Sequence, residues 1–170
     1  PQLDVVINAV GMLHTTEHQP EKSIQQFDTN FFHTNIQTNT LPSLLIAKHF
    51  MAALKTSSRS YFVTISAKVG SIEDNKLGGW ISYRSSKAAL NMAIKTISIE
   101  WRTKLPHCCV IAFHPGTTAS ALSKPFQRNV APHKLFTPTY TAQCLLSLLA
   151  RLTPQETGQF LSYDGNTLPW

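Results

Sequence analysis

The sequence predicts an α/β fold in which a doubly wound parallel sheet carries helices on both faces. Short apolar runs alternate with longer segments of helical periodicity, without repeats or low-complexity linkers. The alternation has the spacing of βαβ units, whose crossover helices cover a parallel sheet. With 170 residues, 42% of them hydrophobic, the chain can form one domain, or most of one, around a substantial core.

Four strands and four helices account for this alternation. Apolar runs predict strands at residues 3–8, 60–66, 107–114 and 158–163. Helical periodicity predicts helices at residues 21–32, 34–55, 83–104 and 140–152. Pro42 falls within the second helix, where it should kink the helix or mark an early turn.

Tyr83 and Lys87 are four residues apart at a predicted helix start and therefore share one face, while Ser66 ends a predicted strand. This combination suits hydride transfer, because a ketone that gains hydride also needs a proton. A free phenol, with a pKa of about 10, is a weak acid near neutrality. The attraction between tyrosinate and ammonium is at most about 4 kcal/mol at about 4 Å, so we expect Lys87 to lower the pKa of Tyr83. Ser66 would hold the substrate oxygen.

These residues resemble the active site of the short-chain dehydrogenase/reductase family, which combines a Ser, a Tyr-x-x-x-Lys and a helix Asn. Asn39, in Thr38-Asn39-Thr40-Leu41, falls where the family carries its catalytic Asn. Residues 4–11 resemble the family's fourth strand and its Asn-Asn-Ala-Gly turn. Residues 114–120 resemble its Pro-Gly loop, and residues 158–170 resemble the tail of the C-factor-like branch.

The resemblance implies an oxidoreductase that transfers hydride between NAD(P)(H) and a small-molecule carbonyl or alcohol, with Tyr83 as general acid and base. The implied catalytic residues are Ser66, Tyr83, Lys87 and Asn39. The implied cofactor-binding residues are Asn8, Gly11, Tyr83, Lys87, Pro115, Gly116, Thr118 and Ser120. Of these, Asn8 is expected to support the turn more than to touch substrate.

The resemblance further implies the C-terminal part of a Rossmann-like domain whose first three strands are absent. The chain begins at Pro1 and contains no Gly-x-Gly-x-x-Gly turn, so we expect a fragment that is weak or inactive alone, with the pyrophosphate site upstream. The choice between NAD and NADP depends on a residue after the missing second strand. Val10 replaces a small residue beside the adenosine, and a long stretch between Ser66 and Tyr83 predicts an extended substrate loop.

Composition argues against several other classes of function. The net charge of +6 and pI of 9.4 invite nucleic-acid binding, but the basic residues are scattered without aromatic interleaving, so we expect no nucleic-acid partner. The seven histidines lack zinc-ligand spacing, and no apolar run reaches the ~18 residues of a membrane span. Cys108 and Cys109 are adjacent on a strand and should face opposite sides, and the odd number of cysteines favours reduced thiols in the cytoplasm.

The sequence leaves two other functions open. The first is a catalytically silent oligomerising or signalling module, because helices 34–55 and 83–104 resemble those that pair subunits in this family. We accordingly expect a homo-oligomer, a dimer or tetramer, in the complete protein. The second is a serine-lysine hydrolase, suggested by Ser85, Ser86 and Lys87, although these serines lie beside the lysine on one helix rather than across a pocket.

Overall fold

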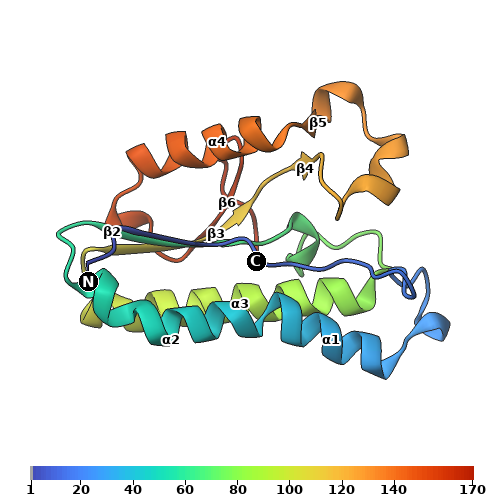
Figure 1. Ribbon diagram of the computed structural model, residues 1–170, viewed down its shortest axis with the longest axis horizontal. Helices are drawn as coiled ribbons and strands as arrows, with labels where there is room; N and C mark the ends of the chain where they lie inside the picture. Colours follow the sequence, from blue (N-terminus) through green and yellow to red (C-terminus); the bar gives the residue numbers. More distant parts are fainter. Residues whose placement is uncertain (1) are drawn as a thin grey trace.

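The computed structural model describes residues 2–170 and contains a four-stranded parallel sheet between two helical layers (Figure 1). The strand order is β1-β2-β3-β6. The strands are β1 (Val5–Asn8), β2 (Ser60–Ile65), β3 (Cys108–His114) and β6 (Gln159–Ser162). All three strand pairs are parallel, so the predicted doubly wound α/β fold is confirmed.

Three helices cover one face of the sheet (Figure 1). They are α1 (Thr29–Asn39), α2 (Leu41–Lys55) and α3 (Ile81–Lys104). The core on this face includes Phe62 and Val110 from the sheet and Leu90, Ile94 and Trp101 from α3. Because α3 spans 24 residues and buries this apolar stripe, it forms a rigid support for the side chains at its start.

Helix α4 (Pro138–Arg151) covers the opposite face, where Leu145 and Leu149 pack against Val63 and Ile111. The adjacent cysteines divide between the layers as predicted. Cys108 belongs to the core under α3, and Cys109 belongs to the core under α4. Adjacent strand residues point to opposite faces, which explains this separation.

The predicted helix over residues 21–32 is wrong in its first eight residues. Only a 3-10 turn, η1 (Ile24–Gln26), forms there, and α1 begins at Thr29 after the Asp28 side chain accepts a hydrogen bond from Phe31 N at 2.7 Å. Pro42 lies in the first turn of α2, where its missing N–H leaves no helical bond unmade. The segment 34–55 is therefore two helices that meet at Thr40, and the proline marks an early turn.

The remaining predicted elements exist with shifted ends. Strand β1 starts two residues later than predicted, and α3 starts two residues earlier. Helix α4 starts at Pro138 because the side chain of Thr137 caps it by accepting from Tyr140 N at 3.1 Å. A small second sheet of β4 (Thr117–Thr118) and β5 (Leu135–Phe136) was not predicted, because its two-residue strands are too short to show a period.

Short 3-10 helices connect these elements: η2 (Lys68–Gly70), η3 (Lys124–Asn129), η4 (Pro132–Lys134) and η5 (Pro154–Glu156). Within residues 2–170, no helix is both long and apolar enough to span a bilayer.

Candidate active site

The carboxyl ends of the parallel strands meet at one edge of the sheet, where doubly wound folds bind their ligands. Asn8 ends β1, Ser66 follows β2 and His114 ends β3. The start of α3 lies at the same edge, since its second turn contacts the end of β2. Residues that are far apart in the sequence therefore come together here.

Tyr83 and Lys87 occupy the first two turns of α3 and are 6% and 3% exposed. The Lys87 Nζ atom lies 5.9 Å from the centroid of the Tyr83 ring. It donates a 3.0 Å hydrogen bond to the carbonyl oxygen of Ile65, the residue before Ser66. Lys87 thus links the face of α3 that carries Tyr83 to the end of β2, which Ser66 follows.

Burial sets the ionisation of both groups. It raises the pKa of Tyr83 to about 12 and lowers the pKa of Lys87 to about 8. The expected lowering of the Tyr83 pKa is therefore wrong for this arrangement. The physical reason is that tyrosinate loses its hydration in the buried site, and this penalty exceeds the attraction of the ammonium. Tyr83 consequently holds its proton at neutral pH.

Ser66 is buried, and its Oγ atom donates a 2.6 Å hydrogen bond to Asn91 Oδ1. Asn91 was missed in the sequence, although it continues the four-residue spacing of Tyr83 and Lys87 on one face of α3. Its Nδ2 atom is buried without a hydrogen-bond partner. Buried donors of this kind are rare and point to a functional or positional demand.

Asn39 lies at the end of α1 and clamps the loop after β1. Its Oδ1 atom accepts from Met12 N at 2.6 Å, and its Nδ2 atom donates to Met12 O at 2.9 Å. Nδ2 also donates to Ser86 Oγ at 2.8 Å, which fixes α1 against α3. A side chain at Gly11 would stand 3.4 Å from Lys87 Nζ and 3.7 Å from Asn39 Oδ1, so the glycine keeps space open beside the lysine.

Asn8 supports the turn after β1, as expected from the sequence. Its Oδ1 atom accepts from Val10 N at 3.0 Å, and its Nδ2 atom donates to Ser43 Oγ at 2.6 Å. Both polar atoms of the side chain are thereby used within the protein. The amide orders the edge of the site through the backbone that it holds.

The Pro115-Gly116 loop follows β3 and bends through a left-handed glycine. Gly116 has a φ of +69°, and a Cβ atom there would lie 2.5 Å from the Phe136 ring. Thr118 Oγ1 lies 2.8 Å from Thr141 Oγ1 and so joins the loop to α4. Ser120 is exposed on the segment beyond β4, and its backbone N–H donates to Ser123 Oγ.

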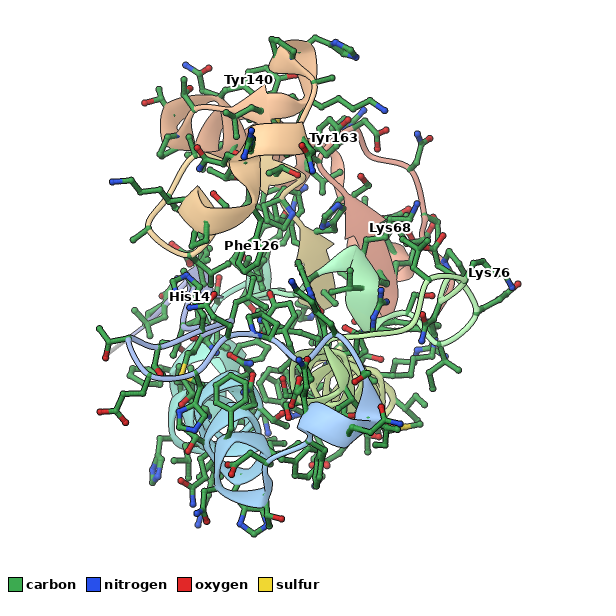
Figure 2. The ribbon with its side chains drawn as sticks, turned by 90° about the vertical axis from the view of Figure 1, so that its right-hand side faces the viewer. His14, Lys68, Lys76, Phe126, Tyr140 and Tyr163 are labelled. Atoms are coloured by element: carbon green, nitrogen blue, oxygen red, sulfur yellow. The ribbon has the colours of Figure 1, made fainter. Side chains whose placement is uncertain are left out.

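An aromatic group that sequence reasoning missed lies beside Tyr83. The Trp80 ring centroid is 6.4 Å from that of Tyr83 and 5.0 Å from that of Phe126. His14 contacts the Phe126 ring edge-on at 5.9 Å, and Figure 2 shows these two side chains next to each other. The three rings other than Tyr83 come from separate segments, so no local pattern predicts their meeting.

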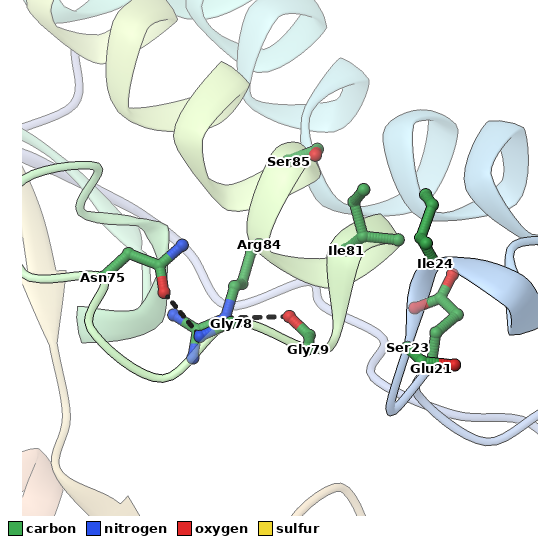
Figure 3. Close-up of a pocket in the computed structure, with 9 residues that line it drawn as sticks. All are labelled: Glu21, Ser23, Ile24, Asn75, Gly78, Gly79, Ile81, Arg84 and Ser85. Carbon is green, nitrogen blue, oxygen red and sulfur yellow. Dashed lines mark hydrogen bonds between the residues drawn. The ribbon is translucent and has the colours of Figure 1, made fainter.

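A hollow of about 280 Å³ lies on another side of α3 (Figure 3). Ile81, Arg84 and Ser85 line it, and helical geometry places Ile81 and Ser85 on the side of α3 opposite Tyr83 and Lys87. The hollow is therefore separate from the candidate active site. In the part of the chain that the structure describes, no group of three or more His, Cys, Asp or Glu side chains could hold a metal ion.

This fold and this group of side chains define a class of protein with a serine, tyrosine and lysine at the carboxyl edge of a parallel sheet. The model of the short chain dehydrogenase family matches residues 1–131. The chain belongs to the short-chain dehydrogenase family.

Two similar proteins illustrate the range of the family. The chain is 31% identical over 169 residues to 1-hydroxy-2-glutathionyl-2-methyl-3-butene dehydrogenase of Rhodococcus sp. (strain AD45), covering 99% of this chain and 69% of that protein. It is 27% identical over 132 residues to C-signal of Myxococcus xanthus, covering 78% of this chain and 74% of that protein. The second similarity agrees with the C-factor-like features of the sequence.

Solved structures share the architecture. The NADPH-bound carbonyl reductase from chicken fatty liver superposes with a TM-score of 0.85 at 26% identity, covering 99% of this chain and 66% of that chain. The carbonyl reductase Sniffer of D. melanogaster gives a TM-score of 0.84 at 24% identity, covering 99% and 67%, and supports the fold alone. The chain thus spans about two thirds of the length of these structures.

Proposed function

We propose that the complete protein transfers hydride between NAD(P)(H) and a small-molecule carbonyl or alcohol, with Tyr83 as general acid and base. The observation that carries this proposal is the meeting of Ser66, Tyr83 and Lys87 at the edge of the sheet. Family membership supports the oxidoreductase chemistry, and the NADPH named for the chicken carbonyl reductase supports the cofactor class. When bound, the nicotinamide supplies or accepts the hydride.

The residues present fit the nicotinamide end of such a cofactor. The Lys87 amine uses one N–H on Ile65 O and has further donors to offer a ribose hydroxyl. Gly11 keeps the space beside that amine free of a side chain, and Gly116 turns the loop after β3. Lys87, Gly11 and the Pro115-Gly116 loop would hold this end, with Thr118 and Ser120 further along the loop.

The reaction that we propose is reversible proton transfer at the Tyr83 hydroxyl. With its pKa raised to about 12, the phenol is protonated at neutral pH and can donate to a carbonyl oxygen that gains negative charge. The ammonium form of Lys87, favoured below a pKa of about 8, would stabilise the tyrosinate that remains. Ser66 would turn its hydroxyl from Asn91 Oδ1 to the substrate oxygen and stabilise the developing charge.

The hydrolase alternative has little support. Ser86 Oγ accepts from Asn39 Nδ2 and donates to the Tyr83 carbonyl oxygen at 2.8 Å, so its hydroxyl is committed to the packing of α1 on α3. Ser85 lines the separate hollow instead of the candidate site. Neither serine faces a base across a pocket, as nucleophilic catalysis requires.

Exposed apolar side chains on the helices support the proposed homo-oligomer. They include Leu44, Leu45 and Phe50 on α2 and Met92 and Ile99 on α3. Apolar groups that gather on one helical layer favour burial against a second copy. Light scattering of the complete protein and of a Leu45→Glu variant tests this, and an unchanged molar mass in the variant would contradict a role for α2.

The thiols support a reducing compartment, and we propose the cytoplasm. Cys108 and Cys109 are free and buried in the sheet, and Cys144 is free on α4. Disulfides form and persist mainly in oxidising compartments. Microscopy of the tagged complete protein would test this location, and signal confined to a secretory compartment would contradict it.

The test of the proposed activity follows the absorbance of NADPH and of NADH at 340 nm with a set of aliphatic and aromatic carbonyls. Consumption that requires both protein and carbonyl is the expected result. Acylation of a serine by an activated ester, with no nicotinamide oxidation, would favour the hydrolase instead. Failure to oxidise either nucleotide with any carbonyl would favour the catalytically silent module.

A further inference from the structure

The backbone just before α3 is unusual at Trp80. Gly78, Gly79 and Trp80 have φ values of +65°, +66° and +53°, so three successive residues lie in the left-handed region. Glycine accepts this conformation readily, but a bulky side chain does so seldom. Among residues 2–170, Trp80 is the one non-glycine residue with a positive φ. Such outliers cluster at functional sites, where the surrounding structure holds them in place.

Contacts on both sides hold Trp80 in this conformation. Its backbone N–H donates to the carbonyl oxygen of Glu21, and its carbonyl oxygen accepts from Arg84 N at 2.8 Å. The Glu21 side chain, 3% exposed, accepts from both the backbone N–H and the hydroxyl of Ser82. Arg84 Nε also donates to Gly79 O at 3.0 Å, a bond drawn in Figure 3. The segment that contains Glu21, 61 residues before Ser82 in the sequence, therefore helps to hold the strained turn in place.

The constrained backbone places the indole next to the candidate acid. The Trp80 and Tyr83 rings meet edge to face at 71°, and the Trp80 and Phe126 rings are tilted by 57°. Trp80 and Phe126 are both half-buried, so each keeps some surface that a ligand can cover. This surface is aromatic, and the Trp80 ring that forms part of it contacts the phenol ring of Tyr83 directly.

We propose that Trp80 and Phe126 form the specificity wall of the substrate site, which selects carbonyls or alcohols bearing a flat aromatic or conjugated group near the reacting carbon. The inference rests on the oxidoreductase function proposed above. A planar apolar group gains both buried area and favourable ring contacts against such a wall, whereas a short aliphatic group gains little. Trp80 is thus assigned a substrate-binding role, and Glu21 positions it.

Two diones of similar reactivity test the wall in the complete protein, 1-phenyl-1,2-propanedione and 2,3-butanedione. Trp80→Gly removes the ring while retaining a residue that accepts the positive φ, so the fold should be kept. We expect kcat/KM for the aryl dione to fall at least 30-fold, about the scale of a lost apolar or aromatic contact, and at least tenfold more than for butanedione. Trp80→Phe should recover much of the difference, and Phe126→Leu should reproduce it in part.

Leu77→Gly is the matched control, since Leu77 lies in the same loop and is 91% exposed. It should leave the ratio of the two kcat/KM values unchanged. Equal losses for both diones in Trp80→Gly, or no loss for either, would overturn the specificity wall while the oxidoreductase function stands.

A binding measurement separates the inference from the proposed function. Saturation-transfer NMR with acetophenone reads contact with the wall without any turnover. Weaker binding to Trp80→Gly than to the wild type, with Leu77→Gly unchanged, would support the wall even if no carbonyl were reduced. Equal binding of acetophenone to Trp80→Gly and to the wild type would overturn it.

Discussion

The hydroxyl of Ser66 donates a 2.6 Å hydrogen bond to Asn91 Oδ1 and so joins the end of β2 to the third turn of α3. The same helix carries Tyr83 and Lys87, and Lys87 Nζ bonds to Ile65 O one residue before the serine. Two side-chain bonds therefore fix the strand end that holds the serine to the helix that holds the proton donor.

This relationship predicts coupling between Ser66 and Asn91. Ser66→Ala should lower turnover by about 10²-fold, because it removes a donor to the developing oxyanion. Asn91→Ala should lower turnover about tenfold, because the serine loses the partner that orients it. The double variant should be no slower than Ser66→Ala alone in steady-state assays of the complete protein. Losses that simply multiply would show that Asn91 acts independently of Ser66.

The buried amine of Lys87 predicts a specific pH dependence of stability. Its pKa is lowered to about 8 from 10.5, so between those values the unfolded chain binds more protons than the folded protein. The free energy of unfolding should therefore rise with pH across this window, by on the order of 3 kcal/mol at about 1.4 kcal/mol per pKa unit. Below pH 8 the charged amine carries its full burial penalty.

Urea unfolding of the wild type and of Lys87→Met at several pH values between 8 and 10 measures this contribution. The difference in unfolding free energy between the two proteins should change with pH in favour of the wild type. That range also stays mostly below the ionisation of Tyr83, whose raised pKa of about 12 gives the opposite slope between pH 10 and 12. A difference that does not vary with pH would contradict a lowered pKa at Lys87.

Close packing at Gly70 predicts a sensitive position behind the site. A Cβ atom there would lie 2.7 Å from Lys87 Cβ and 2.9 Å from the Lys87 carbonyl carbon. Gly70→Ala should therefore lower the free energy of unfolding by about 1–3 kcal/mol and reduce turnover by displacing the lysine. Gly70→Val should be worse in both respects. Wild-type values for both variants, by chemical denaturation and initial rates, would refute this packing.

The edge strand predicts self-association of the 170-residue chain. Val5 and Ile7 of β1 are 42% and 44% exposed, and the strand has a partner, β2, on one side of the described sheet. Exposed apolar edge strands template further pairing. Light scattering should show oligomers that shrink in the variant Ile7→Lys. Equal molar masses for Ile7→Lys and the starting chain would assign the association to another surface.

Much of the fold was predictable because its signals are local. Apolar runs marked β2 and β3, and the spacing of Tyr83 and Lys87 placed both side chains on one helix face. The helix predicted over residues 21–32 fails at its start because the Glu21 side chain bonds to Ser82, which lies far away in the sequence. No local pattern carries that information.

The site shows the same division. Ser66, Tyr83 and Lys87 were found from residue type and spacing, and Asn91 could have been found by extending that spacing one turn. The net shift of the Tyr83 pKa was predicted with the wrong sign, because charge attraction can be estimated from sequence whereas the desolvation of a buried phenol cannot. Trp80 and Phe126 could not be paired from sequence, because their contact depends on how the loops fold.

The most direct measurement of the central proposal compares nicotinamide oxidation by the wild type and by Tyr83→Phe in the complete protein. Phenylalanine keeps the buried ring but removes the proton donor, so turnover should fall by at least ~10²-fold. Circular dichroism and thermal unfolding should change little, because phenylalanine retains the packing of the buried ring. Near-normal turnover in Tyr83→Phe would contradict the assignment of Tyr83 as general acid and base.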